Sequence, residues 1–161
     1  VCQPRTLVRT QDVGLHRHRM TLAEIIKTAA NGNADADVFL VGWHEYCHLI
    51  DDIVDRDANA TLAIDVGAMA AALYTTPFFV EHAEKLRPLI LLITCLYQDS
   101  VEMEGGETWD RRVADVIRHT GADMIRVVAL ITGGYRHMRR ISRDLHSICY
   151  HAHHDADGNP C

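Results

Sequence analysis

Apolar and polar residues alternate along this chain with the period of a helix. Apolar side chains recur every three or four positions between residues 21 and 150, and no stretch bounded by turn residues alternates with a period of two. The first spacing is typical of amphipathic helices, and the second would indicate strands. The pattern therefore predicts an all-α, single-domain helical bundle. The expected helices span residues 22–30, 36–56, 61–74, 77–84, 89–97 with an extension toward residue 104, 107–119, 123–132 and 135–150.

Several helix ends carry recognisable signals. Thr21 to Glu24 has the form of a capping box, and the Asn31-Gly32-Asn33 turn should end the helix that it starts. Pro77 is expected at an early helical position, and Pro88 is expected to open a new helix. The segment 61–74 has Asp65 as its only charge, so we expect it to be buried.

Composition limits the class of protein. With 161 residues, 48% hydrophobic, 24% charged and only 6% aromatic, the chain fits one helical globular domain at 21–150, between a flexible arm at 1–20 and a polar tail at 151–161. A net charge of −6 argues against nucleic-acid binding. No apolar run is long enough to span a membrane. The five cysteines form no CxxC pair, which favours reduced thiols and a cytoplasmic location.

The stretch 43–57, WHEYCHLIDDIVDRD, holds most of the candidate chemistry. At about 100° per residue, its charged and histidine side chains share one arc of a helix, opposite an apolar face. This arc contains His44, Glu45, His48, Asp51, Asp52, Asp55 and Arg56. Two metal-site patterns overlap within it.

The first pattern is H-E-x-x-H, formed by His44, Glu45 and His48. It places two imidazoles one turn apart to hold Zn²⁺, with the glutamate as general base of a metalloprotease. A metzincin would continue with Gly at 51 and His at 54, where this chain has Asp51 and Val54. Zn²⁺ is the expected metal under this interpretation alone.

The second pattern is D-D-x-x-D, formed by Asp51, Asp52 and Asp55. Three carboxylates in one sector repel each other, and a hard divalent cation relieves that repulsion. Oxygen ligands on one side suit Mg²⁺, or alternatively Mn²⁺, that also binds substrate phosphates. Arg56 could hold a phosphate oxygen, and His48 or Glu45 could support the site.

The segment from His48 to Asp55 resembles the first aspartate-rich motif of trans-prenyltransferases and other class I isoprenoid (terpenoid) synthases. The segment from Glu104 to Asp110, EGGETWD, is similar to the later G-Q-x-x-D segment of that family, with Glu107 in place of glutamine. The resemblance covers roughly residues 36–115 and lacks a second D-D-x-x-D. It implies an isoprenoid-synthase-like core, a diphosphate-containing small molecule as ligand, and an isoprenoid diphosphate-utilising transferase or lyase.

Further residues are candidates for substrate binding. Glu102, Glu107 and Asp110 would complete the polar cavity from a facing helix. Arg139, Arg140 and Arg143 would act as a phosphate clamp opposite the acidic helix. His146, Cys149 and His153 have helical spacing for zinc.

Three alternatives to the isoprenoid-like function stay open. An all-α nucleotide pyrophosphohydrolase would use the same acidic sets to cleave a nucleotide, and a zinc metalloprotease would use the HEYCH segment. A non-catalytic helical interaction protein would show the aspartates as a solvated face with no cavity beside them. A homodimer is a further expected form of association.

Overall fold

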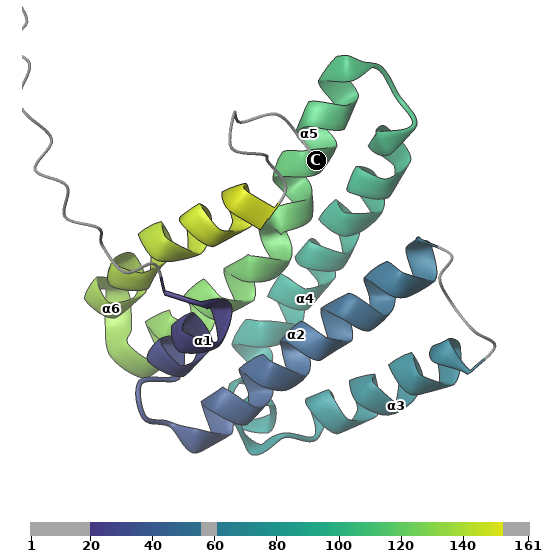
Figure 1. Cartoon of the computed structure of the whole chain (residues 1–161). Helices are drawn as coiled ribbons and strands as arrows, with labels where there is room; N and C mark the ends of the chain where they lie inside the picture. Colours follow the sequence, from purple (N-terminus) through teal and green to yellow (C-terminus); the bar gives the residue numbers. More distant parts are fainter. Residues whose placement is uncertain (1–19, 56–60, 153–161) are drawn as a thin grey trace, which may run out of the picture.

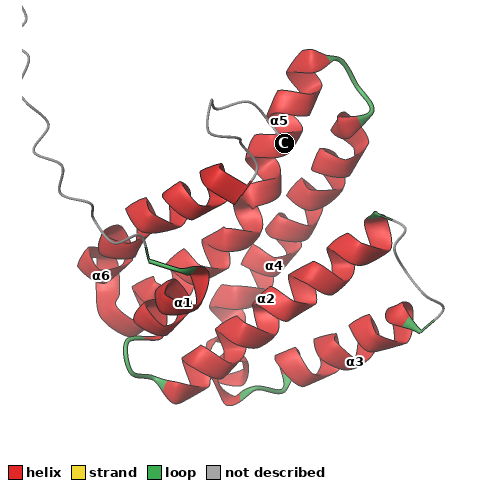
Figure 2. Cartoon of the chain, in the orientation of Figure 1, coloured by secondary structure: helices red, strands yellow, loops and turns green. Residues whose placement is uncertain are grey.

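The computed structural model describes residues 20–55 and 61–152, and within these ranges it contains helices and no strand (Figure 2). This confirms the all-α single-domain bundle. The helices are α1 (Leu22–Ala30), α2 (Ala34–Val54), α3 (Leu62–Tyr74), α4 (Pro77–Glu104), α5 (Thr108–Arg118), the short 3₁₀ helix η1 (His119–Ala122) and α6 (Asp123–Ala152) (Figure 1).

Local capping chemistry sets the ends of α1 as the sequence predicts. The Thr21 side chain accepts from the Glu24 backbone N–H at 3.3 Å, and the Thr21 backbone N–H donates to the Glu24 carboxylate at 2.7 Å. Asn31 ends the helix in the left-handed conformation, with φ of 53°. Its side chain donates to the carbonyl of Thr132 on α6, which fixes the turn against that helix.

Helix α2 is the central element, because it contacts α1, α3, α4 and α6. Phe39 and Trp43 are buried on its inner side, where Phe39 packs against the rings of Phe78 and Phe79 on α4. An exposed row runs along its outer side at spacings of three and four residues, as expected for one face of a helix. The row contains Val38, Val41, Glu45, His48, Asp52 and Asp55.

Helix α4 differs from its predicted form. Thr76 caps it and Pro77 occupies its first turn, as predicted. It then continues through Pro88 to Glu104, so the new helix start expected at Pro88 is wrong. The backbone instead leaves helical geometry at His82, upstream of the proline. A proline removes one hydrogen bond and crowds the carbonyl four residues before it, which for Pro88 is that of Glu84. The break at His82 lies further upstream, so Pro88 does not account for it.

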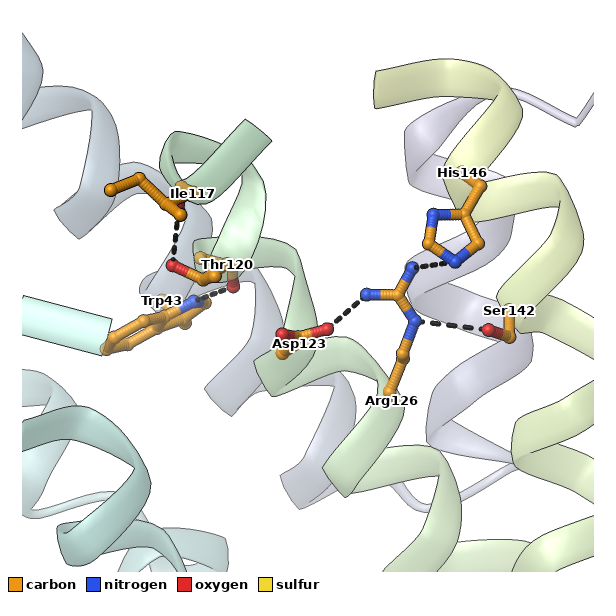
Figure 3. A network of polar contacts seen from close by, with 8 residues as sticks. Trp43, Ile117, Thr120, Asp123, Arg126, Ser142 and His146 are labelled. Carbon is orange, nitrogen blue, oxygen red and sulfur yellow. Dashed lines mark hydrogen bonds and ion pairs between the residues drawn. The ribbon is translucent and has the colours of Figure 1, made fainter. Parts of the chain in front are cut away.

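Helix α6 consists of two arms that meet at Gly134, which confirms the break predicted between residues 132 and 135. Gly134 has φ of 76° and ψ of −178°, a conformation essentially restricted to glycine. Arg126 on the first arm joins the two arms (Figure 3). Its guanidinium pairs with Asp123, donates to Ser142 at 3.1 Å and donates to His146 at 3.2 Å. The second arm therefore folds back along the first.

Helix α3 is not buried, contrary to the sequence expectation. Leu73 is its only buried residue, and Ile64 is 70% exposed. The helix lies at the edge of the bundle, where it packs mainly on α2 (Figure 1). The low charge of residues 61–74 was therefore a misleading indicator of burial, because a helix at the edge of a bundle buries only one of its faces.

The core lies between α1, α2, the part of α4 from Phe78 to Ile93, and both arms of α6. Its largest fully buried side chains include Phe39, Phe78, Leu86, Met124 and Leu145. Among the described residues, no single helix is both long and apolar enough to cross a membrane. Helices α3 and α4 meet that criterion only as a pair, with a bend of 97° between them.

Candidate functional site

A cavity of about 220 Å³ opens between α2, α4 and the η1 turn. Its walls are mainly apolar and aromatic, with a few polar groups at one side. This combination is the usual lining of a small-molecule site. The residues that define its shape are Trp43, Tyr46, Ile50, Ile93, Tyr97 and Gly121.

The polar side of the cavity is built on a contact between Asp51 and Tyr97. The Tyr97 hydroxyl donates to the Asp51 carboxylate at 2.5 Å, which links α4 to α2. Burial raises the pKa of Tyr97 above its usual range, and the hydrogen bond to Asp51 and the negative charge of that carboxylate raise it further. Tyr97 is therefore a neutral donor at physiological pH, and Asp51 is the acceptor.

Arg118 closes the same side of the cavity from the end of α5. Its guanidinium pairs with Glu104 at 2.5 Å and lies 5.5 Å from the centre of the Tyr97 ring, within cation–π range. It also donates weakly to Ser100 at 3.4 Å. The Nη2 atom of Arg118 is buried and has no hydrogen-bond partner within the described part of the chain. Arg118 thus retains one donor that the surrounding protein does not satisfy.

Hydrogen bonds from Trp43 and Thr120 hold the η1 turn in place. The Trp43 indole N–H donates to the carbonyl of Gly121 at 3.0 Å, and the Thr120 hydroxyl donates to the carbonyl of Ile117 at 2.7 Å (Figure 3). Trp43 is only 3% exposed, and its ring also packs against Tyr46 at 5.9 Å. The η1 side of the cavity is therefore held in place by Trp43 and Thr120, whose polar side-chain atoms already have hydrogen-bond partners.

The three predicted metal ligands differ in their exposure. Asp51 is half-buried and lines the cavity, whereas Asp52 and Asp55 are exposed. Asp55 caps the end of α2, and its charge contributes to the raised pKa of Tyr97. In residues 20–55 and 61–152, no group of three His, Cys, Asp or Glu side chains is arranged to hold a metal ion. Arg56 lies outside the described residues.

The H-E-x-x-H segment keeps its two histidines together. The rings of His44 and His48 meet edge to face, 4.4 Å apart. Burial lowers the pKa of His44, and the neighbouring His48 lowers it further by a smaller amount. Within the described ranges no third ligand joins them, and Glu45 points into a groove on the α3 side.

Cys47, between these histidines, is a half-buried thiol on the cavity wall. Burial, with a smaller contribution from Asp51, raises its pKa to about 12. A thiol in this state is a poor nucleophile at neutral pH. Cys95, on α4, is exposed.

The predicted downstream acidic residues do not line this cavity. Glu107 and Asp110 form a capping box at the start of α5, where the Glu107 backbone N–H donates to the Asp110 carboxylate at 3.2 Å. Glu102 is exposed on α4. The local sequence explains the difference, because a helix start binds carboxylates with its free N–H groups.

The predicted arginine clamp lies elsewhere as well. Arg139, Arg140 and Arg143 are exposed on the second arm of α6, away from the C-terminal end of α2 (Figure 1). Arg140 contacts the ring of the buried His137 at 3.0 Å. In the suggested zinc cluster, His146 is engaged by Arg126, and the side chains of Cys149 and His153 lie outside the described residues.

Sequence reasoning missed Tyr97, Arg118 and the η1 turn as parts of the site. The fold and the cavity define an all-α protein with a small-molecule-sized site. Compared with known proteins, the chain matches no family model, no curated protein and no solved structure.

Proposed function

We propose that this protein binds the diphosphate ester of a small apolar compound in the α2–α4 cavity, with Mg²⁺ between the diphosphate and the aspartates of α2. The observation that carries the proposal is the position of Asp51. It belongs to the aspartate-rich segment that resembles the isoprenoid synthases, and of Asp51, Asp52 and Asp55 it is the aspartate that lines the apolar cavity.

The charges around the cavity support a metal-dependent mode of binding. Asp51 lines the cavity, Asp55 follows one turn later, and Arg118 is already paired with Glu104. A bare diphosphate would meet more negative than positive charge there, so like-charge repulsion disfavours it. Mg²⁺ needs only one or two protein carboxylates when substrate phosphates complete its coordination. When bound, Mg²⁺ would offset the charge between the diphosphate and Asp51.

The size and chemistry of the cavity favour an apolar body over a nucleotide. A dry cavity of about 150 Å³ can hold benzene, so about 220 Å³ suits a somewhat larger hydrocarbon group. Reading a base edge requires several free hydrogen-bonding groups. The Trp43 N–H and the Tyr97 hydroxyl are both engaged, and Arg118 keeps only its Nη2 donor unsatisfied. These facts favour the isoprenoid-like function over a pyrophosphohydrolase.

Thermal melting tests the proposal. Geranyl diphosphate with Mg²⁺ should raise the melting temperature, because a ligand that binds the folded state stabilises it. Asp51→Asn should reduce the shift strongly, and Asp99→Asn, an exposed position on α4, should leave it intact. Equal shifts in the two variants, or no shift in the wild type, would contradict the proposal.

Turnover is measured separately. Departure of the diphosphate would release pyrophosphate, and a coupled pyrophosphate assay distinguishes an enzyme from a binding protein. Melting with Zn²⁺ alone, repeated on His44→Ala/His48→Ala, tests the metalloprotease alternative.

A further inference from the structure

The outer layer formed by α2 and α3 is rich in acidic side chains. Neither helix contains a lysine or an arginine. The acidic residues of the two helices and the α2 cap are Asp35, Asp37, Glu45, Asp51, Asp52, Asp55 and Asp65. No Lys or Arg from another described element forms an ion pair with them.

A groove of about 340 Å³ runs between α2 and α3 on this acidic layer. Val38 and Val41 form its apolar wall on α2 and are 59% and 43% exposed, and Met69, Ala72 and Leu73 line it from α3. Asp37 and Glu45 flank them. Val38, Val41 and Glu45 follow the i, i+3, i+7 spacing, so they form one row along the helix. The groove therefore offers an apolar strip with acidic edges.

The second arm of α6 has the complementary surface. Arg136, Arg139 and Arg143 repeat the i, i+3, i+7 spacing and are all exposed. None of the three forms an ion pair within the described part of the chain. Tyr135, at the start of the same arm, is 65% exposed and supplies an apolar surface. The arm therefore offers positive charge to the acidic edges of the groove and an aromatic ring to its apolar strip.

The groove and the arm lie on opposite sides of the molecule, with α3 at the lower right and the second arm of α6 at the left of Figure 1. One molecule cannot bring them together, but two molecules can. We propose that a second copy of this chain docks the arginine row of its α6 arm into the α2–α3 groove. Such a contact joins two different surfaces, so the association is head to tail and continues as a ring or an open chain.

Analytical ultracentrifugation of charge-reversed variants tests this contact. The groove variant Val38→Lys/Glu45→Lys and the arm variant Arg139→Glu/Arg143→Glu change only exposed positions. Val80→Lys/Glu84→Lys on α4 makes the same chemical change away from the groove, and Arg111→Glu/Arg112→Glu on α5 is the control for the arm. Far-ultraviolet circular dichroism and melting curves establish that each variant is folded.

The wild type and both controls should sediment faster with rising concentration, more strongly at about 0.01 M than at about 1 M salt, since salt screens exposed charges. The groove variant and the arm variant should each associate at least about tenfold more weakly than the wild type. A 1:1 mixture of groove and arm variants should recover association, because the reversed groove of one variant meets the reversed arm of the other, and the two unchanged surfaces meet as in the wild type. A monomeric wild type at low salt, a mixture that stays monomeric, or equal losses in the controls would overturn the proposal.

Discussion

The Tyr97 hydroxyl on α4 donates a hydrogen bond of 2.5 Å to the Asp51 carboxylate on α2. Hydrogen bonds to charged groups contribute more than neutral ones, so Tyr97→Phe should lower the free energy of unfolding by about 1.5–3 kcal/mol. Urea denaturation measures the change. Tyr135→Phe is the matched control, because Tyr135 is exposed and should change stability by less than about 0.5 kcal/mol. Equal effects of the two substitutions would show that the Tyr97–Asp51 contact contributes nothing.

The raised pKa of Cys47 predicts that the protein loses stability at alkaline pH. Its pKa rises from an ordinary 9.0 to about 12 through burial and the charge of Asp51. Between these values the unfolded chain releases a proton that the folded protein keeps, so stability is complete below about pH 9 and falls as the pH approaches 12. The raised pKa of Tyr97 acts in the same direction.

The slope of unfolding free energy against pH measures this effect. Cys47→Ala should flatten the slope, whereas Cys95→Ala should not, since Cys95 is exposed. Peptide mapping after iodoacetamide treatment at neutral pH should find Cys95 modified before Cys47. An unchanged slope in Cys47→Ala would contradict the assignment of the buried thiol.

Gly134 and Gly67 should respond in opposite ways to alanine. Gly134 has φ of 76° and ψ of −178°, so Gly134→Ala should destabilise the protein by about 1–3 kcal/mol. Gly67 lies within α3 with open space around it, so Gly67→Ala should stabilise it by about 0.5–1 kcal/mol. Thermal unfolding followed by circular dichroism compares them. A neutral Gly134→Ala would mean that the two arms of α6 do not need the glycine conformation.

Arg126 should hold the two arms of α6 together. Arg126→Met removes its contacts with Asp123, Ser142 and His146, and leaves the buried Ser142 hydroxyl without its partner. The expected cost is about 1–3 kcal/mol. Hydrogen exchange should also become faster in the second arm. Arg112→Met, at an exposed position on α5, should change neither quantity.

The elements that sequence reasoning predicted best are those whose signals are local. The capping box at Thr21, the turn at Asn31, the Thr76–Pro77 start and the break before Tyr135 each depend on a few neighbouring residues. The burial of α3 and the start at Pro88 were predicted wrongly. Both depend on tertiary contacts: whether a helix lies at an edge, and whether packing holds a proline within a longer helix.

The candidate site was predictable only on the α2 side. The spacing of Asp51, Asp52 and Asp55 placed them in one sector, but it could not show that Asp51 turns inward while Asp52 stays exposed. Tyr97 and Arg118 belong to helices far away in sequence, and neither carries a local motif. Their roles follow from the packing of α4 and α5 against α2, which no residue pattern records. Glu107 and Asp110 were predicted to bind substrate, and their spacing is explained by the capping box that they form at the start of α5.

Isothermal titration calorimetry tests whether the protein binds a diphosphate ester through Mg²⁺ and Asp51. Geranyl diphosphate is titrated with Mg²⁺ present and again after chelation with EDTA. We expect binding with Mg²⁺, about tenfold or greater weakening after chelation, and a comparable loss in Asp51→Asn, equivalent to about 1.4 kcal/mol or more. Binding of equal strength with and without Mg²⁺, or no binding in either condition, would contradict the account.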